Sequence, residues 1–256
     1  LGFSLRFVLH ELELAELKST LVSNVSHELK TPLALIRLYS ETLELGRVES
    51  EEKGKEFLRI IGRESPRLTH LINNVLDLSR IEQGAKTYRF SEADVSALVR
   101  ETVEAYRFSL AKQGFVVESE VEDIPPFTAD GEALTQALIN LLDNAIKYYD
   151  KDKRLLVALR SEGGNAVISV TDRGVGIAPA EHARIFDTFY RVERGLVHNV
   201  KGSGLGLSLV RHIAEGHGGN VSLHSRPGEG STFSIHIPLE HRPGDGAPDG
   251  SGGTEP

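Results

Sequence analysis

Residues 140–148 read NLLDNAIKY, a stretch that predicts a helix with one face packed on a core and one polar face. Asn140 and Asn144 stand four residues apart and therefore share a face, which Lys147 and Tyr148 continue. An amide oxygen is a hard ligand that suits Mg²⁺ held jointly with phosphate oxygens, and a lysine supplies positive charge for phosphates. This stretch alone is equally compatible with an ordinary surface helix.

Further along the chain, residues 165–171 alternate as a strand and lead directly into DRGVGI at 172–177. Asp172 would end the strand, where its carboxylate can accept a hydrogen bond from an exocyclic amine such as that of adenine. Gly174 and Gly176 allow the backbone, up to Ile177, to approach a flat ring closely. Many ordinary turns share this pattern, so it is weak by itself.

Residues 201–207 read KGSGLGL and stand just before a predicted helix. Three alternate glycines before a helix N-terminus can form a phosphate cradle from backbone N–H groups and the helix dipole. The segment is not a Walker loop, because no Gly-Lys-Ser/Thr follows, and its spacing does not fit the dinucleotide fingerprint. A fourth segment, GEGSTF at 228–233, forms a turn into the last strand and contains Thr232. Together the four segments, all within residues 140–233, indicate one nucleotide site.

The pattern of apolar residues predicts an α/β region around these segments. Helices are expected at 94–113, 132–149 and 208–215, and strands at 115–122, 154–161, 165–171, 220–224 and 231–238. Helices interspersed with mostly hairpin-linked strands favour a two-layer α/β sandwich, a mixed sheet with helices on one face.

The composition changes at about residue 84, because residues 1–83 contain few glycines and carry apolar residues at helical spacing. Gly46 ends one helical pattern, and a Ser-Glu pair at 50–51 begins another. We expect an N-terminal helical hairpin that dimerises into a four-helix bundle, because a lone hairpin leaves its apolar stripe uncovered. The overall class is then α+β. A coiled-coil spacer is the alternative for these residues alone.

Residues 26–33 read SHELKTPL and place a histidine on the first helix. The helical angle turns His27 away from the apolar stripe, towards solvent. Glu28 could hydrogen-bond one ring nitrogen and leave the other as a nucleophile. Thr31 follows one turn later, and Pro32 frees the carbonyl of Glu28 and bends the helix. An ordinary surface histidine is the other interpretation.

The composition excludes several classes of function. The chain has 256 residues, 29 Lys plus Arg against 37 Asp plus Glu, a net charge of −8, and no Cys. Disulfides, thiolate metal sites and cysteine nucleophiles are therefore absent, and the acidic balance argues against a nucleic-acid coat. No apolar run is long enough to span a membrane. The chain begins with Leu1 and lacks Met, so we expect a piece of a longer protein.

Residues 27–32, HELKTP, resemble the phosphoacceptor box of the sensor histidine kinases of two-component systems. The later segments resemble, in order, the asparagine, glycine and phenylalanine boxes of their ATP-binding domain, which has the Bergerat-type fold of gyrase, the Hsp90 chaperones and MutL. FDTFYR at 186–191 fits the phenylalanine box. The resemblance covers roughly residues 15–240.

The resemblance implies a set of cofactors and roles. ATP would place adenine on Asp172, Mg²⁺ on Asn144, and phosphates near Asn140, Lys147 and the 202–206 loop. His27 would attack the γ-phosphate with Glu28 as base and orienter, and the phosphoryl group would pass to an aspartate of a response regulator. Thr31 would support a phosphatase reaction on that regulator. The other residues assigned to the nucleotide are Tyr148, Gly174, Gly176, Ile177, Arg191, Gly202, Ser203, Gly204, Leu205, Gly206, Leu207 and Thr232.

The same resemblance implies a domain plan. Residues 1–16 would end a signalling helix, 17–83 form the dimerisation and histidine phosphotransfer domain, 84–91 a hinge linker, 92–240 the ATP-binding domain, and 241–256 a disordered tail. The expected partners are a second copy, a response-regulator receiver domain and an upstream sensor region, but no nucleic acid. We expect the cytoplasmic portion of a membrane-anchored sensor.

Two other functions compete with this one. In the first, ATP drives dimer closure as in gyrase and chaperones, and no histidine is phosphorylated; that reading leaves the histidine box unexplained. In the second, the chain is an inactive scaffold, which predicts loss of Asn144, Asp172 or the glycines, and all are present.

Overall fold

The computed structural model describes residues 23, 25–150, 152–188, 190, 192 and 204–240. The chain divides into two compact units, residues 1–86 with 188–205 and residues 87–187 with 206–256, and each is described by itself. The expected signalling helix at 1–16 and the expected tail at 241–256 lie outside the described residues. So do three predicted site residues, Arg191, Gly202 and Ser203.

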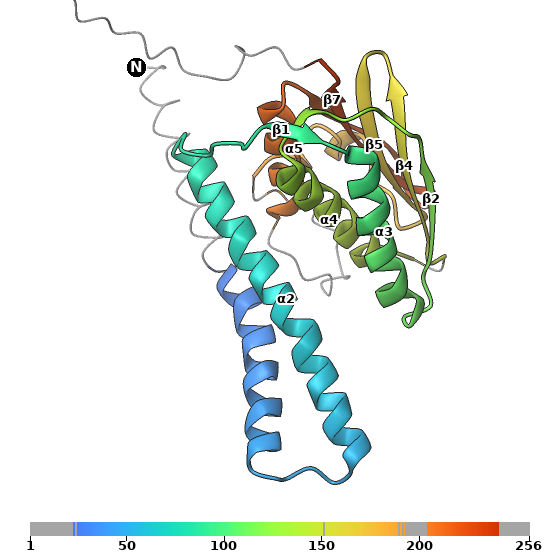
Figure 1. Ribbon diagram of the computed structural model, residues 1–256. Coiled ribbons are helices and arrows are strands. Elements are labelled where there is room, and N and C mark those ends of the chain that lie inside the picture. The colour runs from blue at the N-terminus through green and yellow to red at the C-terminus, as the bar shows by residue number, and fades with distance from the viewer. Residues whose placement is uncertain are drawn as a thin grey trace, which may run out of the picture. The chain divides into compact units, whose positions relative to one another are not determined.

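The first unit contains the predicted helical hairpin. A helix over 25–44 is joined by a short loop to α2 (Glu51–Glu82), and the two run side by side (Figure 1). The side chain of Ser50 caps α2 by accepting a hydrogen bond from the backbone N–H of Lys53. Gly46 adopts a φ of 64° at the end of the first helix, the left-handed geometry that glycine favours.

The hairpin covers only part of its apolar surface. The rings of Tyr39 and Phe57 meet between the two helices, with centroids 4.6 Å apart. Other apolar side chains in this unit are between 42% and 61% exposed: Leu33, Leu38, Leu45, Leu58, Ile72 and Leu76. A single hairpin cannot bury the whole stripe, which is the reason for expecting a second copy.

The second unit confirms the predicted sandwich with a mixed sheet. The strand order is β2-β4-β5-β7-β6, where β2 pairs parallel to β4 and all other pairs are antiparallel. The strands are β2 (Val116–Val121), β4 (Arg154–Glu162), β5 (Asn165–Asp172), β6 (Asn220–Arg226) and β7 (Gly230–Pro238). The helices α3 (Val95–Ala111), α4 (Gly131–Lys147) and α5 (Gly206–Gly216) cover one face of the sheet (Figure 1).

The core of this unit lies between the helices and the sheet. Leu134, Leu138 and Leu142 of α4 are completely buried, as are Ile168 of β5 and Ile235 of β7. Buried and half-buried residues alternate along β7, as expected for a strand with one face on the core. Burial at about 25 cal/mol per Å² of apolar surface makes this layer the main source of stability.

Two short strands and a short helix were not predicted. β1 (Ser91–Ala93) pairs antiparallel with β3 (Phe127–Ala129), and a 3₁₀ turn, η1, covers Pro179–Glu181. A strand of three residues is too short to show alternation, so the sequence carries no signal for it. In the part of the chain that the structure describes, no helix combines the length and the apolar run needed to cross a bilayer.

Candidate functional site

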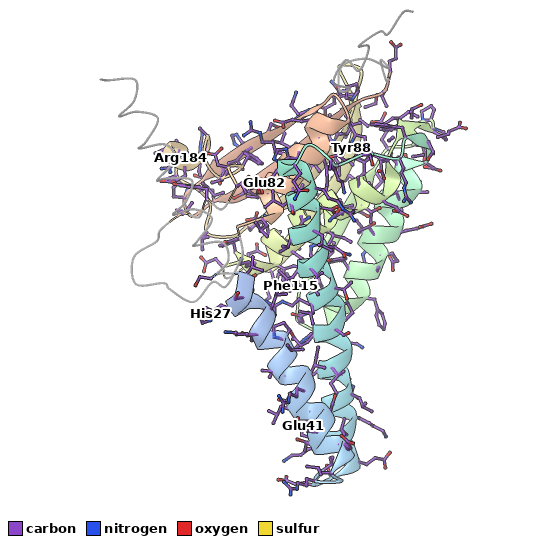
Figure 2. All side chains as sticks on the ribbon, turned by 90° about the vertical axis from the view of Figure 1, so that its left-hand side faces the viewer. His27, Glu41, Glu82, Tyr88, Phe115 and Arg184 are labelled. Carbon is purple, nitrogen blue, oxygen red and sulfur yellow. The ribbon has the colours of Figure 1, made fainter. Side chains whose placement is uncertain are left out.

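His27 lies on the first helix with its side chain exposed, as the helical angle predicts (Figure 2). Thr31 donates a hydrogen bond from its hydroxyl to the carbonyl oxygen of His27 over 3.3 Å. Glu28 is half-buried and Pro32 is buried. Because proline has no N–H, the carbonyl of Glu28 lacks its usual helical donor. Since the His27 side chain is exposed, its imidazole is accessible to a reagent from solvent.

Asp172 is a buried carboxylate at the end of β5, with only 6% of its surface exposed. Its Oδ1 accepts a hydrogen bond from the backbone N–H of Gly174 over 2.8 Å. Burial raises the pKa of the Asp172 carboxyl, and backbone hydrogen bonds from Gly174 and Ser231 oppose that shift. A buried carboxylate with remaining acceptor capacity can recognise an amine donor such as that of adenine.

The loop after Asp172 fits closely against two other segments. A side chain at Gly174 would overlap the carbonyl oxygen of Tyr148, and one at Gly176 would overlap that of Arg226. Gly176 also has a φ of 64°. Both glycines are thus required by close backbone approach, and Gly176 by its left-handed conformation as well.

Tyr148, directly after the last residue of α4, contacts this loop. The carbonyl of Tyr148 accepts a hydrogen bond from the N–H of Val175 over 3.2 Å. The ammonium of Lys147 lies 5.2 Å from the centre of the Tyr148 ring, within cation–π range. The polar face predicted for 140–148 is therefore continuous with the Asp172 loop at its C-terminal end.

Thr232 connects the last strand to the same end of the sheet. Its hydroxyl lies 2.9 Å from that of Thr171 on the neighbouring strand, and the two residues are directly opposite in the ladder. Asp172 and Ser231 are the next pair in the same register. Thr232 thus lies one ladder position from Asp172.

Asn140, in the middle of α4, lies against the start of α5. Asn140 is buried, with 4% exposure, and its amide donates to the carbonyl of Gln136 over 3.0 Å. A side chain at Gly206, the first residue of α5, would come within 3.2 Å of its Oδ1. Asn144, one turn further, is half-buried. Asn140 therefore contacts the start of α5, whereas Asn144 keeps an accessible amide.

In the KGSGLGL segment at 201–207, the described residues begin at Gly204. Gly204 has a φ of 73°, Leu205 is completely buried, and Leu207 is half-buried within α5. Asp143, an exposed residue on the polar face of α4, accepts a hydrogen bond from the hydroxyl of Tyr106 on α3 over 3.0 Å. Burial is the main cause that raises the pKa of Tyr106, with the Asp143 charge adding to it.

The structure thus brings Asp172, Gly174, Gly176, Ile177, Tyr148 and Thr232 together at one end of α4. Sequence reasoning missed Ser225, which is buried on β6 and bonded to this loop. Its partner in this loop, Ile177, is 48 residues away in the sequence, and a single serine before a Pro-Gly turn carries no signal of such a contact.

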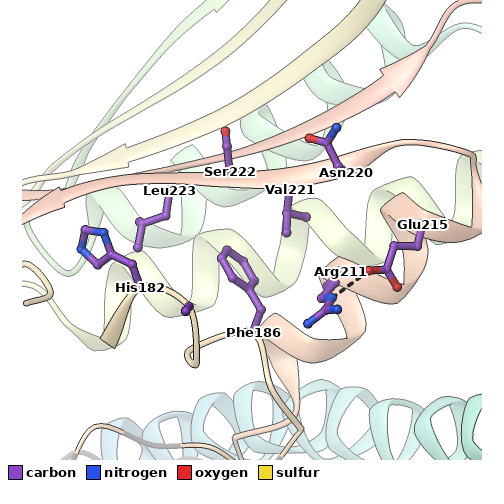
Figure 3. A pocket seen from close by; sticks show the side chains of 9 residues that line it. His182, Phe186, Arg211, Glu215, Asn220, Val221, Ser222 and Leu223 are labelled. Atoms are coloured by element: carbon purple, nitrogen blue, oxygen red, sulfur yellow. Dashed lines mark hydrogen bonds and ion pairs between the residues drawn. The ribbon is translucent and has the colours of Figure 1, made fainter. Parts of the chain in front are cut away.

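The phenylalanine-box segment begins beside a groove of about 440 Å³ between β6 and α5 (Figure 3). Phe186 projects into this groove, opposite Val221 and Leu223, and its ring meets that of Phe233 edge-on with centroids 6.2 Å apart. Arg211 on the rim is paired with Glu215 over 2.7 Å. Phe186 therefore anchors its segment on the edge of the sheet.

Two family models match the chain. One is the His Kinase A (phospho-acceptor) domain, over residues 17–84, and the other is the histidine kinase-, DNA gyrase B-, and HSP90-like ATPase, over residues 129–241. His27 lies in the first match, and the Asp172 loop and the whole of α4 lie in the second. The order of the two domains agrees with the resemblance seen in the sequence.

Similar proteins point the same way. Drug sensory protein A of Synechocystis is 37% identical over 88% of this chain and 36% of its own length. Sensor-like histidine kinase SenX3 of Mycobacterium tuberculosis is 34% identical over 85% of this chain and 53% of its own. The crystal structure of full-length ShkA in complex with AMPPNP matches with a TM-score of 0.62 and 26% identity, covering 86% of this chain and 46% of that one.

The chain therefore spans about a third to a half of the length of these relatives. Both catalytic parts are present, in the family's order, with an exposed histidine in one and a buried carboxylate beside a glycine loop in the other. The chain belongs to the sensor histidine kinases, as a catalytic core that joins a phosphoacceptor domain to an ATP-binding domain.

Proposed function

We propose that this chain is an ATP-dependent protein-histidine autokinase that phosphorylates His27 and passes the phosphoryl group to an aspartate of a response regulator. The observation that carries the proposal is the presence, in one chain, of an exposed His27 and a buried Asp172 carboxylate held by a glycine loop. The first supplies a nucleophile and the second a site for the adenine amine.

The chemistry needs one lone pair and one proton acceptor. A neutral imidazole nitrogen of His27 attacks the γ-phosphorus, the bond to the β–γ bridging oxygen breaks, and ADP leaves with that electron pair. The proton on the other ring nitrogen then passes to the Glu28 carboxylate, which also orients the ring beforehand. Most of the rate acceleration in such a transfer comes from positioning the two reactants, because the protein contributes little covalent chemistry of its own beyond the nucleophile.

A magnesium ion would neutralise phosphate charge during this transfer. The donor set fits that ion, because Asn144 offers a half-exposed amide oxygen on the polar face of α4. Among the described residues, no group of three or more acidic or histidine side chains could hold a metal. We infer that the nucleotide's phosphates supply the remaining ligands, with Asn140 and Lys147 near them.

The test is incubation of the chain with γ-labelled ATP and Mg²⁺. A label that survives alkali, is lost in acid and disappears in His27→Gln supports the autokinase. His224→Gln, a change of an exposed histidine on β6, is the matched control and should keep its label. ATP hydrolysis without any labelled protein would favour the gyrase-like alternative and overturn the proposal.

The role proposed for Asn144 has a separate test. Asn144→Asp should abolish labelling of His27 without unfolding the chain, because the new charge alters metal and phosphate binding. Asn220→Asp makes the same change at an exposed position of β6 and should leave labelling intact. Unchanged labelling of Asn144→Asp would remove Asn144 from the metal site.

We also propose that the chain works as a homodimer and accepts a response-regulator receiver domain. The exposed leucines of the hairpin support a second copy, because it would cover them in a four-helix bundle. Thr31 lies one turn from His27, and we propose that its hydroxyl positions water for dephosphorylation of the regulator. Thr31→Ala should keep autophosphorylation and lose that phosphatase reaction.

Finally, we infer that the hinge between the two domains is short. On one side, Lys86 pairs with Asp77 of α2 over 2.6 Å, and both side chains are largely covered. On the other side, the hydroxyl of Tyr88 donates to the carbonyl of His212 over 3.0 Å. The chain is then free to turn between these two anchors, at 86–88, which lies within the 84–91 expected from the sequence.

A further inference from the structure

The loop between Asp172 and Ile177 is fixed at both ends. At its start, the N–H of Gly174 donates to the Asp172 carboxylate over 2.8 Å. At its end, the N–H of Ile177 donates to the hydroxyl oxygen of Ser225 over 2.8 Å. The first bond is local, whereas the second joins the loop to β6, 48 residues further along the chain.

The hydroxyl of Ser225 uses all of its hydrogen-bonding capacity. It donates its one proton to the carbonyl of Gly230 over 2.8 Å. It lies 2.9 Å from the hydroxyl of Ser231, and since its own proton is committed, Ser231 must be the donor in that contact. With the N–H of Ile177, both lone pairs are occupied. Ser225 is 5% exposed, so water does not offer a substitute partner.

The same hydroxyl is connected to Asp172 through Ser231. Asp172 and Ser231 are opposite residues in the β5–β7 ladder. The backbone of Ser231 hydrogen-bonds the Asp172 carboxyl and counters the rise in its pKa that burial causes. One buried hydroxyl on β6 therefore bonds two other segments, the loop after β5 and the first two residues of β7.

The turn between β6 and β7 also contacts the 172–177 loop. The N–H of Gly228 donates to the carbonyl of Val175 over 3.0 Å, and Gly176 packs directly on the carbonyl of Arg226. These contacts require the end of β6 to lie beside the loop. Ser225, next to the last residue of β6, is hydrogen-bonded to the loop at Ile177.

We propose that Ser225 is a positioning residue for the nucleotide site. It holds the Gly174–Ile177 backbone and the Asp172 carboxylate in the geometry that receives adenine, acting through Ile177 and Ser231. This inference rests on the proposed ATP-binding function. Without the hydroxyl, the Ile177 N–H and the Gly230 carbonyl lose their partners, so the loop is expected to shift towards water.

The experiment compares Ser225→Ala with Ser222→Ala in the full chain. Ser222 is on the same strand but exposed, and its hydroxyl lies 2.8 Å from His236 on the side away from the loop. For Ser225→Ala we expect the KM for ATP in His27 labelling to rise about tenfold, with kcat changed less than about twofold. Ser222→Ala should match the unmodified chain in both constants.

A second readout separates positioning from general loss of structure. Purine riboside triphosphate lacks the exocyclic amine, so the affinity ratio of ATP to this analogue reports on Asp172. Ser225→Ala should reduce that ratio, because the carboxylate is no longer fixed. A merely destabilised domain would lose both nucleotides equally, and an unchanged ratio with an unchanged KM overturns the proposal.

Two further controls keep the outcome decisive. If Ser225→Ala does not fold by circular dichroism, Ser225→Cys takes its place, because the slightly larger thiol fills the space of the hydroxyl but hydrogen-bonds weakly. If the unmodified chain neither binds ATP nor labels His27, the proposed function fails. If it does both and the Ser225 variants behave identically to it, only the role of Ser225 fails.

Discussion

The backbone N–H of Asp130 donates a hydrogen bond to Nε2 of His217 over 3.0 Å, joining residues 87 positions apart. Nδ1 of the same ring donates to the carbonyl of Ile213 over 2.7 Å, so the two partners select the neutral Nδ1–H tautomer. His217 is 3% exposed, and the rings of Tyr88 and Phe90 pack on it with centroids 5.2 and 5.1 Å away. One imidazole thus links the segment after the hinge to α4 and α5.

Replacing this ring should cost stability. His217→Ala leaves the Asp130 N–H without its acceptor and opens a cavity beside Tyr88, so we expect the free energy of unfolding to fall by about 2–3 kcal/mol. His224→Ala, at an exposed position of β6, should change it by less than about 0.5 kcal/mol. Urea unfolding followed by circular dichroism measures both. Equal values for the two variants would contradict the assigned role of His217.

Gly216 tests the anchor of the linker. A side chain there would overlap the ring of Tyr88, so Gly216→Ala should displace Tyr88 and break its bond to the His212 carbonyl. We expect His27 labelling to slow about fivefold, because a looser linker lowers the effective concentration of the nucleotide at His27. ATP affinity should stay within about twofold.

The control is Gly62→Ala, at a helical glycine of α2 with open space around it. This change should stabilise the helix by about 0.5–1 kcal/mol and leave ATP affinity unaltered. A Gly216→Ala variant that labels His27 at the normal rate would show that Tyr88 does not limit the transfer.

Lys86 tests the other end of the hinge. Its ammonium and the Asp77 carboxylate are 17% and 12% exposed, so Lys86→Ala removes a close cationic partner from a largely buried carboxylate. We expect the helical unit to lose about 1–2 kcal/mol, measured by thermal unfolding of the full chain. Lys53→Ala removes an exposed pair with Glu49 and should leave the unfolding midpoint close to that of the unmodified chain. A similar loss for both would mean that the Lys86 pair is an ordinary surface pair.

The Asp172 carboxyl should couple stability to pH. Its folded pKa is raised by burial, so the folded state keeps a proton that the unfolded state has already lost. The stability from this proton is fully present below the ordinary pKa and is lost as pH rises through the raised folded pKa. Asp172→Asn cannot titrate, so its melting temperature relative to the unmodified chain should increase from acid to neutral pH.

The same variant should lose ATP. An Asn side chain at 172 presents an N–H group either to Gly174 or to the adenine amine, so one donor always faces another, and we expect affinity to fall more than about tenfold. Asp150→Asn, at an exposed position, should bind ATP normally.

In the pH experiment, a parallel pH dependence of the melting temperature for Asp172→Asn and the unmodified chain would refute the raised pKa of Asp172.

The sequence predicts the long helices and strands of the second unit correctly. Strand ends at 154, 165, 220 and 238 agree with the structure, and α3, α4 and α5 begin and end within two residues of expectation. Apolar spacing is a local property, so it survives without knowledge of neighbours. β1 and β3 were missed because each has three residues and is held by its partner rather than by its own pattern.

The candidate site divides in the same way. The exposure of His27, the shared face of Asn144 and Lys147, and the carboxylate of Asp172 at a strand end all follow from positions close together in the sequence. The burial of Asn140 under Gly206, in contrast, depends on where α5 packs against α4. A helical period predicts which side chains share a face, not which neighbour covers it.

What the sequence by itself determined is the set of chemical groups and the local conformation around each of them. Only the tertiary structure decided which of these groups hydrogen-bond to one another. Ser225 bonds to Ile177, His217 to Asp130, and the Tyr88 hydroxyl to the carbonyl of His212, 124 residues away. These bonds form because buried donors and acceptors must find partners, and the partners are brought close by sheet register and helix packing. That requirement acts across the whole fold, so no short stretch of the chain records it.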